Sequence, residues 1–157
     1  MVGLYCKDDF INAIVLTIKM EELQVDIVPS NYQDLLSDEK RAFAALVTIM
    51  NDGSPQVTPI WFNTDGVHIL INTAKGRVKD RNMRARAQVA ILIQDPGNPY
   101  RYLQIRGRVV EVTKEGADAH IDALAGKYTG VPKYQRNRPG EVRETFKILP
   151  EHVVGMG

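Results

Sequence analysis

Hydrophobic and polar residues alternate along most of the chain from residue 42 onward. A period of two places successive side chains on opposite faces of a sheet, so the pattern predicts half-buried β-strands. The predicted strands, in chain order, are Ala42–Met50, Gln56–Asn63, Val67–Thr73, Ala87–Gln94, Tyr100–Thr113 and Val142–Leu149. Turn sequences rich in Asn, Asp, Gly and Pro separate several of them. Short strands joined in this way predict a mainly β domain that closes into a small barrel.

Three positions predict irregularities in these strands. Pro59 lies in the middle of the second strand, and a proline cannot donate to the hydrogen-bond ladder, so an edge strand or a bulge is expected there. Gly107 interrupts the alternation of the fifth strand and predicts a bulge or a sharp bend. After the last strand, Pro150 begins a tail in which Val153 and Val154 are expected to add a short pairing.

Helices are expected at three places between and before the strands. A Ser-x-x-Gln pattern predicts a short helix over Asn31–Leu36 with Ser30 as its N-cap. A basic helix is expected after Gly76, and another over Glu115–Lys127. The segment Val131–Glu141 is rich in Pro, Lys, Arg and Tyr and predicts an irregular loop.

The length of 157 residues suits one domain with a substantial core. We interpret residues 28–157 as that domain and residues 1–27 as an N-terminal extension. The apolar run Phe10–Met20 is interrupted by polar residues and is shorter than the roughly 20 residues that span a bilayer. A core or interface element is therefore expected there, and no membrane partner.

The chain is close to neutral, with 20 basic and 19 acidic residues and a net charge of +1. This balance argues against a general nucleic-acid binder. The lone cysteine, Cys6, excludes an intramolecular disulfide and any multi-cysteine metal site, which suits a reducing compartment, and a cytoplasmic location is expected. The histidines lie on separate predicted elements, so no metal site is expected.

The basic charge is concentrated where the strand Val67–Thr73 gives way to the basic helix. Six Lys and Arg residues against the single Asp80 give this segment, residues 75–86, a local charge of +5. A helix N-terminus flanked by cations would suit a phosphate, because its first backbone N–H groups lack partners. Solvent-exposed charges that serve only solubility are the alternative.

Aromatic residues provide a second, weaker signal. Trp61, Tyr100 and Tyr102 could together offer a platform for a planar ring, although strand aromatics more often serve packing or an interface. Neither the basic segment nor these aromatic rings indicates a specific function by itself.

Four segments in the same order resemble the pyridoxamine 5′-phosphate oxidase-like flavoproteins. The segments are Asp52–Phe62, Asn72–Met83, Gln94–Val112 and Arg138–Val142. They are most similar to the subgroup of deazaflavin-dependent oxidoreductases. The likeness covers roughly residues 28–156 and leaves the N-terminal extension outside it.

The resemblance implies a mainly β fold with flanking helices (α+β), a six-stranded split β-barrel of the FMN-binding type that forms a homodimer. It implies FMN or the deazaflavin coenzyme F-420 in a groove between the subunits. The implied cofactor-binding residues are Gln56, Val57, Thr58, Asn72, Thr73, Arg77, Lys79, Asn82, Tyr100 and Tyr102.

In such relatives, residues matching Arg77, Lys79 and Asn82 hold the phosphate, and the Gln56–Thr58 strand lies along the ring. Asn72 and Thr73 approach the ring or its ribityl chain, and the Tyr-Arg-Tyr segment comes from the other subunit. No side chain stands out as a general acid or base, so no catalytic residue is assigned.

The function expected from this resemblance is an oxidoreductase in which the bound ring carries hydride to or from a small organic substrate. A cofactor carrier or sensor without turnover would use the same residues. Single-stranded nucleic-acid binding would rest on the basic segment with the nearby tyrosines, but the near-neutral net charge speaks against it.

Overall fold

The computed structural model describes residues 27–157. The N-terminal extension expected over residues 1–27 therefore lies outside the described residues, Ile27 excepted. The apolar run Phe10–Met20 also lies outside them.

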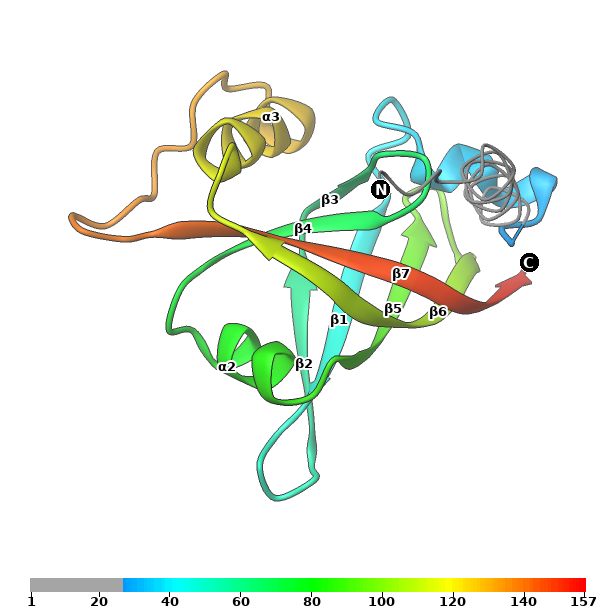
Figure 1. The fold of residues 1–157 in the computed structure, drawn as a ribbon. Helices are drawn as coiled ribbons and strands as arrows, with labels where there is room; N and C mark the ends of the chain where they lie inside the picture. The colour runs from blue at the N-terminus through cyan, green and yellow to red at the C-terminus, as the bar shows by residue number, and fades with distance from the viewer. Residues whose placement is uncertain (1–26) are drawn as a thin grey trace, which may run out of the picture.

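A single antiparallel sheet of seven strands makes up most of the described chain (Figure 1). The strands are β1 (Phe43–Ile49), β2 (Pro55–Ile60), β3 (Phe62–Thr64), β4 (Ile69–Ala74), β5 (Gln88–Asp95), β6 (Asn98–Thr113) and β7 (Arg143–Met156). The helices are the 3-10 helix η1 (Ser30–Leu36) and the α-helices α2 (Val78–Ala85) and α3 (Ala117–Thr129). None of the helices described over residues 27–157 is long and apolar enough to cross a membrane.

The sheet is curled into a half-barrel, as its strand order requires. The order is β2-β1-β5-β6-β7-β4-β3, so β2 and β3 form the two outer edges. Yet Trp61 alone separates these strands in the sequence. The two edges must therefore approach each other at Trp61, which they can do only if the sheet rolls up. The predicted mainly β fold with flanking helices is confirmed, with seven strands rather than six because Trp61 divides the predicted strand Gln56–Asn63.

Both predicted irregularities inside strands are confirmed. Pro59 lies on β2, an edge strand, where it pairs only with Ala45 of β1. The pairing of β6 with β7 shifts register between Arg106 and Gly107. A Cβ atom at Gly107 would overlap the carbonyl oxygen of Leu149, so the close approach of the two backbones requires glycine.

Two predictions at the ends of elements are wrong. The N-cap of η1 is Pro29, no side chain caps this helix, and its hydrogen bonding is that of a 3-10 helix. The last strand does not end before Pro150, because β7 continues to Met156. The irregular pairing opposite Gly107 accommodates this proline, which has no N–H to donate.

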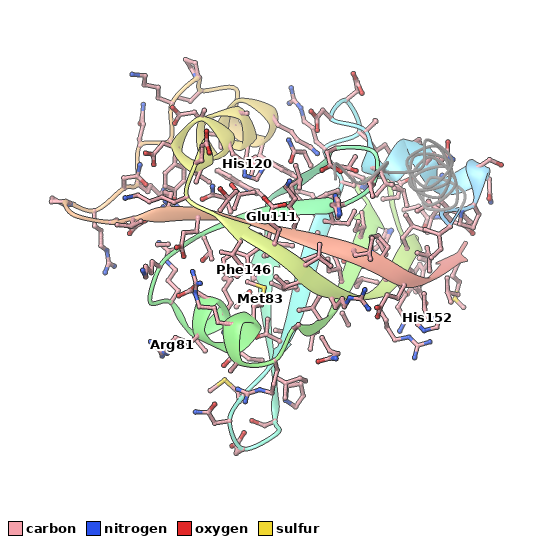
Figure 2. All side chains as sticks on the ribbon, in the orientation of Figure 1. Arg81, Met83, Glu111, His120, Phe146 and His152 are labelled. Carbon is pink, nitrogen blue, oxygen red and sulfur yellow. The ribbon has the colours of Figure 1, made fainter. Side chains whose placement is uncertain are left out.

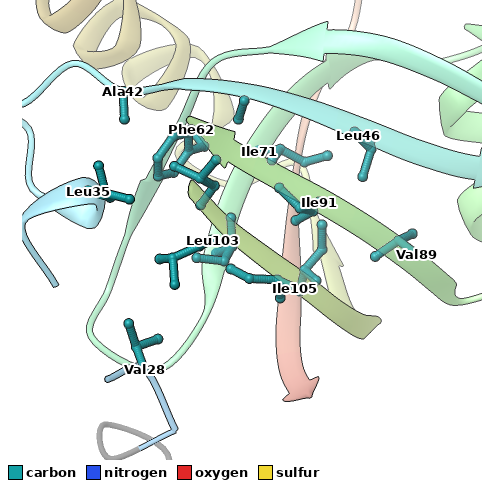
Figure 3. Close-up of a cluster of buried hydrophobic side chains, with 14 of the residues drawn as sticks. Val28, Leu35, Ala42, Leu46, Phe62, Ile71, Val89, Ile91, Leu103 and Ile105 are labelled. Carbon is teal, nitrogen blue, oxygen red and sulfur yellow. The ribbon is translucent and has the colours of Figure 1, made fainter. Parts of the chain in front are cut away.

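The core lies inside the curled sheet (Figure 3). The inward-facing residues predicted on β5, Val89, Ile91 and Ile93, are all buried, and they meet side chains such as Leu103 of β6. Each such side chain contributes roughly 1.5–3 kcal/mol to folding by leaving water. In Figure 1, η1 and α2 lie at opposite ends of the sheet. Leu35 of η1 and Met83 of α2 add to the same core.

A network of charges fastens η1 to the turn between β5 and β6. Arg101 donates to Asp34 across 2.6 Å and to Asp95 across 2.7 Å, and Lys40 approaches Asp95 at 2.9 Å. The hydrogen bond from Lys40, together with those from the Gly97 N–H and Arg101, holds the pKa of Asp95 far below its usual range.

Candidate functional site

The turn between β4 and α2 has a closely hydrogen-bonded backbone. Gly76 adopts a φ of +86°, a left-handed conformation that glycine tolerates best. Its N–H donates to Oδ2 of Asp80 across 2.7 Å, and its carbonyl oxygen accepts from Nη1 of Arg81 across 2.6 Å. Among the described residues no side chain caps the first turn of α2, whose N-cap residue is Arg77. The turn therefore presents the start of α2 in a fixed position, without a side chain on its N-terminal amides.

Three of the six cations in this segment are held by protein groups. Arg81 donates to Gly76, and Figure 2 shows it on the outer side of α2, while Met83 points toward the sheet and Phe146. Arg84 forms ion pairs with Asp80, at 2.8 Å, and with Glu144. Arg86 donates to the carbonyl oxygen of Ile49 across 2.9 Å and to the side chain of Asn51. The concentrated charge is thus partly neutralised within the protein.

Arg77 and Lys79 are held far less firmly. The nearest carboxylate oxygen to Arg77, Oε1 of Glu141, lies 3.5 Å away, and the same oxygen is 2.5 Å from Arg143. Within residues 27–157 no carboxylate lies within ion-pair distance of the Lys79 ammonium. Partial burial, and to a lesser degree the charge of Arg77, lowers the pKa of Lys79. An anion bound here would relieve both effects.

An open groove of about 470 Å³ lies beside this turn. Residues 74–77 form one wall and residues 138–141, which precede β7, form the other. The groove collects cations from both walls, Lys75 and Arg77 on one and Arg138 on the other, with Glu141 as the acidic residue. Its size and charge suit a phosphate-bearing ligand.

A chain of hydrogen bonds runs from α2 into the barrel. Nδ2 of Asn82 donates to Oγ1 of Thr48 across 3.0 Å, and the Thr48 hydroxyl donates to Oε1 of Gln56 across 3.0 Å. The same amide lies 3.2 Å from Sδ of Met50. Asn82 and Thr48 are buried, so Asn82 faces the barrel interior rather than the groove. The structure thereby links Asn82 and Gln56, two of the residues expected around the cofactor.

Within residues 27–157, buried oxygens without a hydrogen-bond partner mark three more of the expected residues. They are Oγ1 of Thr58, Oγ1 of Thr73 and Oδ1 of Asn72. Buried polar atoms are nearly always paired, with protein, water or ligand, so unpaired ones point to a missing partner. Asn72 also donates from Nδ2 to the carbonyl oxygen of Ala117 on α3, across 2.8 Å. Because adjacent strand residues face opposite sides, Asn72 is turned toward α3 and Thr73 toward the core.

The remaining expected residues lie on the surface. Val57 is 64% exposed and Tyr100 is 82% exposed. Tyr102 donates its hydroxyl to Sδ of Met156 across 3.2 Å, at the far end of β7 from Arg143. Arg143 pairs with Ala74 beside the groove. Fourteen residues of extended strand cover on the order of 40 Å, so these tyrosines cannot reach the groove of their own chain.

Four residues at the site were not among the cofactor-binding residues expected from the sequence, and one of them, Lys75, was noted there only as part of the basic segment. Thr48 ties α2 to the barrel, and Arg138 and Glu141 line the groove. The segment Arg138–Val142 carried part of the family likeness, so a signal for the second wall was present. Thr48 gave no signal, because a threonine in a strand is ordinary.

Comparisons with known proteins agree in the family that they indicate. The sequence model of the family described as pyridoxamine 5′-phosphate oxidase matches residues 29–156. Among curated proteins none matches the chain. Among solved structures, one described as an F420 reductase is 32% identical, with a TM-score of 0.72, and the match covers 81% of this chain and 98% of the other.

Two more distant structures share the fold. A conserved hypothetical protein from Mycobacterium tuberculosis is 23% identical with a TM-score of 0.63, over 83% of this chain and 86% of that one. HupZ from Group A Streptococcus is 18% identical with a TM-score of 0.57, over 82% and 93% of the two chains.

Proposed function

The chain belongs to the pyridoxamine 5′-phosphate oxidase family, and we propose that it is an oxidoreductase that binds FMN or the deazaflavin coenzyme F-420 at the α2 end of the barrel. The observation that carries the proposal is the partly buried Lys79, which has no ion-pair partner within residues 27–157, beside Arg77, whose contact with Glu141 is long at 3.5 Å. The similarity to an F420 reductase supports a flavin-type ligand.

The phosphate of either cofactor would lie between Arg77 and Lys79, at the uncapped start of α2. Burial makes an unpaired ammonium costly, and an anionic phosphate offsets that cost by charge-assisted hydrogen bonds. Asn82 acts differently from the two cations. Its buried amide positions α2 against β1 through Thr48 and so keeps the cations in place.

The ring would lie along β2. Gln56 is already oriented by Thr48. The hydroxyls of Thr58 and Thr73 are buried and have no partner in the described part of the chain, so they are available to polar atoms of the ring or its ribityl chain. Val57 projects from the opposite, exposed face of β2, so its side chain would meet a different part of the ligand from Gln56 and Thr58. When bound, the ring supplies hydride transfer to or from a small organic substrate, and these residues bind and orient it.

A second copy of the chain would complete the site. Tyr100 and Tyr102 lie too far along β6 to reach their own groove, and Tyr100 is almost fully exposed. In a homodimer the tyrosines of one protomer can cover the ring bound by the other. Mixing Tyr100→Ala protein with Lys79→Gln protein tests this arrangement. Exchanged dimers should regain one tight site that neither variant has, whereas tyrosines acting within one chain would give no recovery.

The proposed phosphate-binding site at Arg77 and Lys79 is tested by titrating FMN, and separately coenzyme F-420, into wild-type, Arg77→Gln and Lys79→Gln proteins. Each variant should weaken binding by about 1–3 kcal/mol, or roughly 5-fold to 150-fold. Arg106→Gln is the matched control, since Arg106 is an exposed cation on β6. Unchanged affinity in both site variants would place the phosphate elsewhere.

Turnover is tested with the loaded protein. Absorbance of the bound cofactor should change when the protein meets small organic hydride acceptors or donors. A cofactor that binds tightly through Arg77 and Lys79 but never changes its redox state across the screen would identify a carrier instead.

A further inference from the structure

A second hollow, of about 230 Å³, lies beside Trp61 and shares no lining residue with the groove at α2. Its walls come from the end of α3 and from the irregular segment before β7. The lining residues are Trp61, Ala125, Thr129, Val131, Lys133, Tyr134, Gln135 and Arg136. This is smaller than the roughly 300–1,000 Å³ of drug-sized sites, so the hollow suits a single-ring compound.

The aromatic walls of this hollow are held in a fixed geometry. Tyr128 stacks on Trp61, with ring centroids 5.5 Å apart and an interplanar angle of 8°. Tyr134 meets Trp61 edge-on, at 5.9 Å and 89°. Two perpendicular rings form a corner in which a planar ligand can stack on one ring and touch the other with its edge.

Protein contacts keep Tyr134 in this corner. Its backbone N–H donates to Oδ1 of Asp122 on α3, across 2.9 Å. The guanidinium of Arg143 lies 4.6 Å from the centre of its ring. The corner is therefore built before any ligand arrives, although Tyr134 belongs to a segment without helix or strand.

The charge around the corner is positive. Lys133 and Arg136 both line the hollow and are exposed, and in the described part of the chain neither forms an ion pair. The nearby carboxylate of Asp122 already accepts the Tyr134 N–H. A ligand that combines a flat ring with a negative group would use the corner and the cations together.

We propose that the hollow between Trp61 and Tyr134 is a binding site for a small planar anion, such as an aromatic carboxylate. The ring stacks in the aromatic corner, and the anionic group faces Lys133 and Arg136. The segment 131–141 lines this hollow and, through residues 138–141, the groove at α2 as well. The two sites are therefore lined by successive parts of one segment. Naming this anion the substrate rests on the proposed function, but its binding does not.

The chain supplies its own reporter, because Trp61 is its one tryptophan. Titration of cofactor-free protein with 4-nitrobenzoate should quench Trp61 fluorescence saturably. The uncharged 4-nitrobenzamide, which has a ring of the same shape, should bind about tenfold more weakly, as expected for the loss of two exposed charge contacts. Added salt should weaken only the carboxylate, because it screens exposed charges.

The variants separate the ring from the charge. Lys133→Gln combined with Arg136→Gln should lower 4-nitrobenzoate affinity about tenfold and leave 4-nitrobenzamide unaffected. Tyr134→Leu should weaken both probes. Arg106→Gln, which removes an exposed cation on β6, should change neither. Circular dichroism of each variant checks that the fold is kept.

Three results would overturn the site: quenching that rises linearly without saturation, equal affinity for the two probes, or full retention of 4-nitrobenzoate affinity in the double variant. These results are independent of the proposed function. A protein that binds FMN but shows no saturable quenching keeps the cofactor site and loses this one. A protein that binds 4-nitrobenzoate but neither cofactor keeps the site at Trp61 and loses the proposed cofactor site.

Discussion

Asn82 of α2 donates a hydrogen bond from Nδ2 to Oγ1 of Thr48 on β1, across 3.0 Å, and both side chains are buried. The Thr48 hydroxyl in turn donates a hydrogen bond to Gln56 of β2. The helix that begins beside the cations proposed to bind a phosphate and the strand proposed to lie along the ring are thus joined inside the barrel. Disturbing this pair should affect stability and cofactor binding together.

Replacing Asn82 with Leu should lower the free energy of unfolding by about 1–3 kcal/mol, because it leaves a buried hydroxyl without its donor. Urea unfolding of Asn82→Leu, Thr48→Val and the double variant measures the pair as a cycle. The two effects should be non-additive by about 0.5 kcal/mol or more. Strict additivity would mean that the hydrogen bond contributes nothing to the coupling of α2 and β1.

Lys79→Met should weaken FMN binding without lowering stability. Burial lowers the pKa of Lys79 in the folded protein, so the unfolded chain binds the proton more tightly and the charge disfavours folding at neutral pH. Removing the ammonium removes that cost. We expect an unchanged or higher Tm in thermal unfolding, alongside a lower affinity. A clear drop in Tm would show that Lys79 has a structural partner.

FMN affinity should fall as pH rises through the pKa of Lys79, which lies below the usual 10.5, because only the ammonium form attracts the phosphate. In Lys79→Arg protein the cation stays charged throughout, so this alkaline loss should disappear. Titrations of FMN at a series of alkaline pH values measure both. If FMN affinity declined equally in wild-type and Lys79→Arg proteins, the titrating group would be one other than Lys79.

Gly107→Ala and Gly126→Ala should act in opposite directions. A Cβ at Gly107 would overlap the Leu149 carbonyl oxygen, and moving one backbone against another costs about 1–3 kcal/mol. A Cβ at Gly126, inside α3, has open space around it, so alanine should add up to about 1 kcal/mol through helix propensity. Urea unfolding of the two variants checks the contrast, and equal effects would contradict the close approach of β6 and β7.

His120 should make the protein less stable in mild acid. It lies partly buried between Oγ1 of Thr145 at 3.0 Å and Oδ1 of Asn63 at 2.9 Å, and this partial burial lowers its pKa from 6.5 (Figure 2). The unfolded chain therefore takes up the proton first, and stability declines as pH falls below about 6.5 toward the folded pKa. Thermal unfolding over this range should show a smaller decline in His120→Gln. His152→Gln, which changes an exposed histidine of β7, is the control.

The predicted strands and bulge show which features of the fold follow from the local pattern of the sequence. Side chains alternate along β5 because a strand buries one face, so Val89, Ile91 and Ile93 could be placed inward from the sequence. The irregularity at Gly107 could be predicted for a similar reason, because a glycine within an alternating run indicates a close approach of two backbones. In the candidate site, the cluster of cations around Arg77 and Lys79 was also visible as a local run.

Other features depend on contacts between residues far apart in the sequence. Pro150 interrupts a strand in most settings, but the bulge opposite Gly107 lets β7 continue past it. Likewise, nothing near Arg84 in the sequence shows that Glu144 neutralises it, and nothing near Asn82 shows that Thr48 accepts a hydrogen bond from its amide. These contacts form only when strands and helices pack, so they cannot be predicted from a run of neighbouring residues.

The sequence by itself determined the β-rich architecture, the family and the place where positive charge gathers, because periodicity, turn residues and charge runs are local properties of a chain. Only the tertiary structure decided which cations keep their charge free and which are neutralised. It also separated β2 from β3 at Trp61 and brought this residue against Tyr128 and Tyr134. The physical reason is that burial and pairing depend on distance in space, which the curling of the sheet sets.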